Sequence, residues 1–311
     1  MVGGRIMSVN KTDAGFVEKP AKVRESWDNR LFSVGVVFIL LMLGLLCLLP
    51  FVYLLAISLS SASPVMRGEV FLIPKQFTIS VYQSIISNGS LVKAMGRSVL
   101  LTISYVIVSM VMTVLCAYPM AEAGLKGKGI LWPYFIFTMY FSGGMIPSYL
   151  LVNHLGLIDS MLALILPGMI STYNMIVMRS FFSSIPASLK ESALIDGAGD
   201  LKILTKIILP LSKPALATIA LFYAVSRWNG MQDALLYIND PKKTVLQIKL
   251  RQMIVNAESV NEMLEGITGT LPVAQTIRAG ALIFSLIPVL IIYPFLQKYF
   301  VKGVMIGAVK G

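Results

Sequence analysis

Few residues in this sequence could carry enzymatic or metal chemistry, and they are scattered. The two cysteines, Cys47 and Cys116, each lie inside a long apolar run, where a thiol usually acts as a small buried hydrophobe. With the single histidine, His154, they do not form a zinc site of ordinary composition. Residues 127–129 (Gly-Lys-Gly) lack the hydroxyl residue and the flanking strand of a phosphate-binding loop. The sequence therefore predicts no catalytic residues, no metal and no cofactor bound by this chain.

The composition indicates a membrane protein. Of the 311 residues, 56% are hydrophobic and 13% are charged, whereas about a quarter of a soluble domain is charged. The net charge of +11 does not predict a nucleic-acid partner, because the basic residues lie between apolar runs and form no cluster. A chain with so few charged residues cannot cover a water-exposed surface, so we expect one membrane domain.

Six apolar runs are long enough to cross a bilayer. A hydrocarbon core of about 30 Å needs roughly 20 residues of helix, and a backbone in lipid must satisfy its own hydrogen bonds. The runs are residues 31–57, 98–121, 131–152, 161–182, 214–236 and 274–296. The predicted fold class is all-α: a polytopic membrane protein with six transmembrane helices in a domain of residues 31–300. We expect a cytoplasmic N-terminal segment, 1–30, and a cytoplasmic tail, 301–311.

The loops predict the orientation. Residues 1–30 are polar and have no short apolar core, so we expect no cleavable signal peptide. Lysine and arginine are more frequent in the two terminal segments and in loops 122–130 and 183–213 than in the other loops. Because basic loops remain in the cytoplasm, both termini are predicted to be cytoplasmic.

The loop of residues 183–213 has the most specific pattern. Gly197 and Gly199 interrupt a helical stretch, because glycine readily takes positive φ. Asp200 is a suitable N-cap for a second helix, which Pro210 would limit. The apolar residues expected on one side of that helix are Leu201, Leu204 and Ile208. Such a pair of short amphipathic helices fits either a loop on the membrane surface or a segment that docks into a groove on another protein.

The same loop resembles a known signature. It reads Glu191-Ser192-Ala193, three residues, Gly197, nine residues, then Ile207-Ile208-Leu209-Pro210. This resembles the cytoplasmic coupling signature of binding-protein-dependent ABC importers, Glu-Ala-Ala, three residues, Gly, nine residues, Ile-x-Leu-Pro, with Ser192 as the one departure. The resemblance implies that a partner ATPase contacts a set of eight residues: Glu191, Ser192, Ala193, Asp196, Gly197, Ile207, Leu209 and Pro210.

Two further parts of the sequence, the C-terminus and several mid-chain stretches, resemble the sugar permeases within this class of importers. Residues 297–303 and 307–311 resemble the C-terminal tail of the maltose-type sugar permeases, which implies tail contacts with the ATPase through Gly303, Gly307, Lys310 and Gly311. Residues 140–147, 221–225 with 228–229, and 234–238 resemble related permeases of Gram-positive bacteria that are linked to oligosaccharides.

The resemblance implies a complex in the bacterial cell membrane. Its other members would be a second homologous permease, an ATPase dimer that binds ATP and Mg²⁺, and an extracellular solute-binding lipoprotein. The expected function is ATP-driven import of a carbohydrate by alternating access, with this chain surrounded by membrane lipid.

Five polar or aromatic residues in or near the runs are candidates for a sugar path: Tyr140, Asn174, Arg227, Trp228 and Asn229. Sugar sites combine aromatic faces with amides or charges, and costly polar residues in a span usually face the bundle interior. The alternatives are helix packing or an interfacial anchor. In maltose-type systems the other permease contacts the sugar, so the resemblance also fits a chain that only forms a wall of the cavity.

Other transport classes agree less well with the sequence. An ion-driven transporter would need acidic residues within its spans, but Asp and Glu occur only at their edges, as at Glu122 and Asp233. An intramembrane enzyme would need a paired acid, base or nucleophile at depth. An importer of the same class for a non-sugar solute remains the main alternative.

Overall fold

The computed structural model describes residues 27–122, 124–264 and 271–308, and only the backbone of residues 28, 256–264, 271–273 and 295–308. The chain divides into two units, Met1–Pro50 and Phe51–Gly311. The described part of the first unit is helical and belongs to α1 (Trp27–Ser58). From residue 29 to 50 every side chain is exposed, as expected for an apolar helix whose natural surroundings are lipid.

The second unit is helical, and the described residues contain no strand beyond an isolated bridge between Ser60 and Phe77. The all-α prediction is confirmed. The elements are α2 (Ala62–Met66), α3 (Ser80–Asn88), α4 (Ser90–Ala121), α5 (Lys128–Tyr140), α6 (Met145–His154), α7 (Met161–Ile165), α8 (Thr172–Ser184), α9 (Ala187–Ile195), α10 (Asp200–Ile203), a π-helical turn η1 (Leu204–Ile208), α11 (Leu209–Leu211), α12 (Lys213–Asn229), α13 (Gln232–Tyr237), a 3₁₀ turn η2 (Pro241–Lys243), α14 (Leu246–Leu264) and α15 (Leu271–Ala308).

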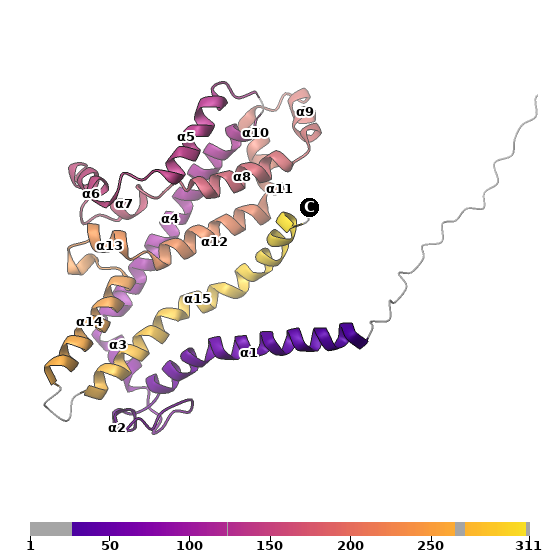
Figure 1. Cartoon of the computed structure of the whole chain (residues 1–311). Coiled ribbons are helices and arrows are strands. Elements are labelled where there is room, and N and C mark those ends of the chain that lie inside the picture. The colour runs from indigo at the N-terminus through magenta and orange to yellow at the C-terminus, as the bar shows by residue number, and fades with distance from the viewer. Residues whose placement is uncertain (1–26, 123, 265–270, 309–311) are drawn as a thin grey trace, which may run out of the picture. The chain divides into compact units, whose positions relative to one another are not determined.

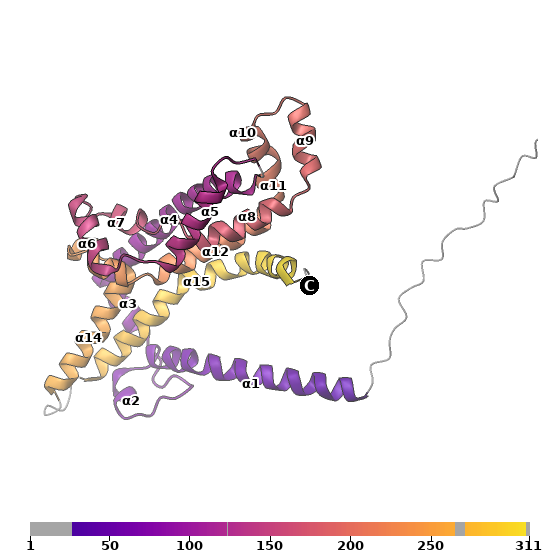
Figure 2. The ribbon, with the colours of Figure 1, turned by 45° about the horizontal axis from the view of Figure 1, so that its top comes forward.

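Helix α4 is the centre of the second unit. It packs against α8 and α12, and α15 packs against the opposite side of α12 (Figure 1). The core between these helices includes Met175, Phe182, Ile219 and Tyr223, all fully or almost fully buried. Figure 2, a turned view, keeps α4, α8 and α12 together, with α9 and α10 beyond one end. The interior of this unit therefore forms around one long helix.

The number of continuous spans differs from the prediction. Three described helices are long and apolar enough to cross a membrane: Asn29–Ser58, Ser90–Ala121 and Ala274–Pro294. Two bent pairs would raise the number to five: α5 with α6, bent by 110°, and α10–α11 with α12, bent by 83°. A count of six is therefore not confirmed.

The predicted third, fourth and fifth runs are not single helices, and the sequence contains the reasons. Run 131–152 breaks where Gly144 takes a φ of +91° between α5 and α6. Run 161–182 is divided into α7 and α8 by a loop that contains Pro167 and Gly168. Run 214–236 ends early, because α12 stops at Asn229 and Gly230 follows in extended conformation. Hydropathy alone does not predict these breaks.

The C-terminal helix is longer than predicted. The sixth run, 274–296, lies inside α15, which continues to Ala308 through the residues assigned to a separate tail. Gly303 and Gly307 are therefore part of a helix, while Lys310 and Gly311 lie outside the described residues. The domain bounds at 30 and 300 stay predictions.

Helix α15 packs against α3 at a glycine. A methyl group at Gly280 would overlap the side chain of Val81, a buried and stiff β-branched residue. Small residues permit this kind of close helix contact in membranes.

We expect Gly280→Ala to lower the thermal stability of the detergent-purified protein, because overpacking a tight contact costs about 1–3 kcal/mol. Gly96→Ala in α4 is the matched control, since a methyl group there meets no atom within 4 Å. A melting temperature for Gly280→Ala equal to that of the wild type would contradict the close α3–α15 contact.

Candidate functional site

The loop of residues 183–213 folds as two helices joined by a glycine elbow. Helix α9 ends in a Schellman motif: Ala198 N–H donates to the Ala193 carbonyl (2.9 Å), and Gly197 N–H donates to the Leu194 carbonyl (3.0 Å). Gly197 has a φ of +73°, which glycine adopts without the steric cost of a side chain. The spacing from Ala193 to Gly197 in the signature is thus the spacing that this helix ending requires.

The second helix of the elbow differs from the prediction in two ways. Gly199 precedes it as the N-cap, and Asp200 is its first helical residue. Leu201 is 72% exposed, whereas Ile203, Leu204 and Ile208 are buried. The reason is the π turn η1, whose wider period places residues five apart on one side. Leu209 and Pro210 follow this turn, and Pro210 lacks an N–H for an ordinary helical bond.

The elbow presents apolar side chains to its surroundings. Leu194 is 55% exposed and Ile195 is 87% exposed, and Leu189 is also exposed. Of the eight residues predicted to contact an ATPase, five are exposed and three are half-buried; the half-buried ones are Ala193, Ile207 and Leu209. Leu194 and Ile195 are neighbours in the chain, and adjacent exposed apolar residues among polar ones are typical of a protein contact.

Charged contacts fix the elbow to the end of α4. The ammonium group of Lys190 on α9 donates to a carboxylate oxygen of Glu122 at 2.6 Å. Lys128 donates to the backbone carbonyl of Glu122 (2.8 Å), and Arg179 donates to the carbonyl of Met120 (3.0 Å). Cations at the C-terminus of a helix satisfy its free carbonyls and interact favourably with its dipole. In the sequence, Glu122 is only an acidic residue at the edge of a span, and its contact with Lys190 depends on how α9 packs against the end of α4.

Arg227 connects four helices at the other end of the bundle. Its side chain, 5% exposed, pairs in bidentate fashion with Asp233 on α13, with 2.8 Å between Nη2 and Oδ1. It also donates to the Leu164 carbonyl on α7 (2.8 Å) and lies over the Tyr105 ring on α4. Gly230 leaves the space for the guanidinium group, which a methyl group there would meet. The spacing of Arg227, Gly230 and Asp233 could have suggested this pair.

Two neighbouring hollows lie between these helices. The larger hollow, about 770 Å³, is lined by Tyr105, Arg227, Asn229, Asp233 and other residues of α6, α7, α12 and α13. The Asn174 hollow, about 320 Å³, is lined by Tyr105, Ser171, Tyr173, Asn174, Phe222, Tyr223 and Ser226. Both have Tyr105 and Ser226 in their walls. The structure thus brings hydroxyl, amide and aromatic groups from distant parts of the sequence together.

The five path candidates do not form one set. Arg227 and Asn229 line the larger hollow, although the Asn229 amide already donates to the Val225 carbonyl (2.9 Å). Asn174 lines the smaller one. Tyr140 is largely exposed, and Trp228 packs against a separate cluster around Leu246; neither lines these two hollows.

The loop before α7 is tied to the segment after α13. The Asp159 carboxylate accepts hydrogen bonds from the backbone N–H groups of Asn239 (2.6 Å) and Asp240 (2.7 Å), and Lys243 donates to the Asp159 carbonyl. Chiefly because of the bond from Asp240, the pKa of Asp159 lies below its ordinary value. This contact therefore holds at neutral pH and is lost only when the pH falls through that lowered pKa.

Comparison with known proteins identifies the family. A family model described as "Binding-protein-dependent transport system inner membrane component" matches residues 30–306. The chain belongs to this family. It is therefore an integral membrane permease component and not an ATPase, as the sequence predicted.

In the described residues, no group of three His, Cys, Asp or Glu residues could hold a metal ion.

Two relatives and one solved structure are similar to this chain over nearly their whole length. The polygalacturonan/rhamnogalacturonan transport system permease protein YtcP of Bacillus subtilis is 44% identical, over 91% of this chain and 99% of the relative. The trehalose/maltose transport system permease protein MalG of Thermococcus litoralis is 28% identical, over 87% and 94% respectively. A chain in the crystal structure of a bacterial ABC transporter involved in the import of the acidic polysaccharide alginate has a TM-score of 0.80 and 34% identity, covering 89% of this chain and 99% of that one.

We expect the Lys190–Glu122 pair to hold α9 against α4. Lys190→Glu should expose the elbow to limited proteolysis, because two like charges would then meet at the end of α4. The swap Lys190→Glu with Glu122→Lys should restore the wild-type cleavage rate. Exposed Lys93, on α4, provides a control as Lys93→Glu. A double variant that is cleaved no more slowly than Lys190→Glu alone would refute the pairing.

We expect Arg227→Lys and Asp233→Asn each to lower the melting temperature by several degrees, because each loses hydrogen bonds to a charged group, which contribute about 1.5–3 kcal/mol. Lysine cannot reproduce the bidentate contact. Asp233→Asn should have the smaller effect, because Asp233 is partly exposed and Arg227 keeps its bond to Leu164. Differential scanning fluorimetry in detergent measures both; unchanged midpoints would contradict the structural role of this pair.

Proposed function

We propose that this chain is the permease subunit of an ATP-driven importer for carbohydrates, in particular oligosaccharides. The matched relatives carry names of polygalacturonan/rhamnogalacturonan and trehalose/maltose transport systems, and the similar crystal structure belongs to an alginate importer. The chain would move its substrate inward by alternating access, coupled to ATP hydrolysis on another protein. The observation that carries the proposal is the exposed, Schellman-capped elbow inside a chain that matches the family over residues 30–306.

The elbow would be the contact with the ATPase. Its exposed apolar residues, among them Leu194 and Ile195, offer a surface to bury in a groove of the partner. Its glycine-dependent turn presents both helices in a fixed geometry, which reduces the entropy lost on binding. The Lys190–Glu122 pair would transmit a displacement of α9 to α4, the central helix of the bundle. The C-terminal residues Gly303, Gly307, Lys310 and Gly311 would add a second contact.

The proposed complex has four kinds of protein. Besides this chain, it contains a second homologous permease, a dimer of ATPase subunits that holds ATP and Mg²⁺, and an extracellular solute-binding lipoprotein. Both termini and the elbow would lie in the cytoplasm of a bacterial cell, and the loops of residues 58–97 and 237–273 would lie outside. Lipid would cover the exposed apolar side chains of the spans.

The substrate would pass the two hollows. Asn229 and the Arg227–Asp233 pair line the larger hollow, and Asn174 lines the other. Since Arg227 is already paired, it would shape the wall of the path and hold α7 against α12 and α13. Tyr140 and Trp228 would belong to contacts with lipid or protein and not to this path.

A matched pair of glycine variants tests the coupling role. Gly197 and Gly199 both have open space for a methyl group, but only Gly197 has a positive φ. We expect Gly197→Ala to strain the elbow by about 1–2 kcal/mol and to lower substrate-stimulated ATP hydrolysis of the reconstituted complex severalfold. Gly199→Ala should behave like the wild type.

The amount of each variant in the membrane, measured by blotting, controls for insertion. If both variants hydrolyse ATP and import sugar at the wild-type rate, the elbow is not the coupling element. Labelling Lys202 from outside intact cells would exclude the proposed orientation.

A further inference from the structure

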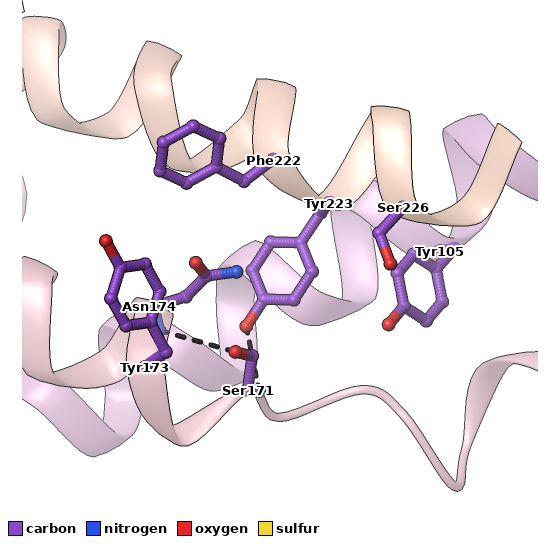
Figure 3. A pocket seen from close by; sticks show the side chains of 7 residues that line it. All are labelled: Tyr105, Ser171, Tyr173, Asn174, Phe222, Tyr223 and Ser226. Carbon is purple, nitrogen blue, oxygen red and sulfur yellow. Dashed lines mark hydrogen bonds between the residues drawn. The ribbon is translucent and has the colours of Figure 1, made fainter. Parts of the chain in front are cut away.

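The Asn174 hollow has a fixed polar wall. The hydroxyl group of Tyr223 on α12 shares a hydrogen bond of 2.7 Å with the Thr113 hydroxyl on α4 and accepts one of 3.0 Å from the Ser171 backbone N–H. Ser171 caps α8, since its hydroxyl accepts from the Asn174 N–H (3.3 Å). Figure 3 shows the two bonds of Ser171, one with the Tyr223 hydroxyl and one with the Asn174 N–H. The first turn of α8 is therefore held against two other helices.

Tyr173, Asn174 and Ser226 make no side-chain hydrogen bond among the described residues of this wall, and of these three only Asn174 is buried. Asn174 is only 5% exposed, yet among the described residues its side-chain amide has no hydrogen-bond partner. The amide extends into the space lined by Tyr173, Phe222 and Tyr223 (Figure 3). The amide is not among the fully buried, unpaired side-chain atoms of the described residues, so it is accessible from the hollow and available to a ligand or to water.

The other groups around this amide indicate the chemistry of the ligand. Tyr173 is 55% exposed and offers an aromatic face, and Ser226 adds a hydroxyl. The residues that line the hollow include no charged side chain. At about 320 Å³, the hollow lies at the small end of ligand sites. An uncharged site with aromatic faces, an amide and hydroxyls suits a compact ring with many hydroxyl groups.

We infer that the Asn174 hollow is a saccharide subsite contributed by this chain, which holds one sugar ring of the substrate during transport. The Asn174 amide donates to and accepts from adjacent hydroxyls of the ring, while Tyr173 packs against its apolar face. The inference rests on the proposed function and goes beyond it: this permease binds the sugar directly and is not only a wall beside a partner's site.

The test uses the complete complex in proteoliposomes, with trigalacturonate and maltotriose as an acidic and a neutral probe. We expect Asn174→Ala and Tyr173→Ala each to lower import of the accepted probe about fivefold to tenfold, as loss of one hydrogen bond or one stacked ring would. ATP hydrolysis stimulated by the loaded binding protein should stay within about twofold of the wild type. A structural defect would instead lower both rates together.

Two exposed residues outside the hollow provide matched controls: Asn153→Ala on α6 for the amide and Tyr134→Ala on α5 for the ring. Both should import the probe at the wild-type rate. Unchanged import by Asn174→Ala and Tyr173→Ala would overturn the inference, as would a parallel fall of import and hydrolysis. If the wild-type complex imports neither probe, the assignment to oligosaccharides fails first, and the subsite fails with it.

Discussion

Each interrupted helix in this protein leaves backbone N–H and C=O groups without helical partners, and inside a membrane such groups must be satisfied by protein. Side chains from other helices meet this constraint at the break between α7 and α8. Arg227 donates to Leu164, Tyr105 donates to Gly168, and the Tyr223 hydroxyl accepts from Ser171. The broken run is therefore stable only because α4 and α12 pack against it.

The same constraint explains the positions of the polar residues in the bundle. The side chains that hydrogen-bond the free backbone groups between α7 and α8 also line the two hollows. One set of residues therefore stabilises the interrupted backbone and forms the wall of the proposed path. Asn174 of the smaller hollow differs from Tyr105 and Tyr223, because its amide serves no backbone group among the described residues. The Asn174 amide is therefore available to a ligand, whereas the hydroxyl groups of Tyr105 and Tyr223 are needed for the fold.

At the other end of α4, side chains again satisfy backbone carbonyls that have no helical partner. Arg179 donates a hydrogen bond to the Met120 carbonyl, and Lys128 donates one to the Glu122 carbonyl. Lys190 on α9 forms an ion pair with the Glu122 carboxylate. The elbow closes its own helix through the Schellman bonds and leaves its apolar side chains free. A rigid segment that is fixed to the central helix and exposed on its outer side is suited to pass a movement from a bound partner into the bundle.

The sequence by itself determined the class, the family signature and the elbow. Low charge and long apolar runs require a helical membrane protein, and the spacing from Ala193 to Gly197 follows from local backbone geometry. The tertiary structure alone decided where the runs break and which polar residues meet. Asp159 and Asn239, or Thr113 and Tyr223, lie far apart in the chain, and hydropathy carries no information on such pairs. Local patterns record short-range conformation, whereas the partner of a buried polar group depends on which helices pack together.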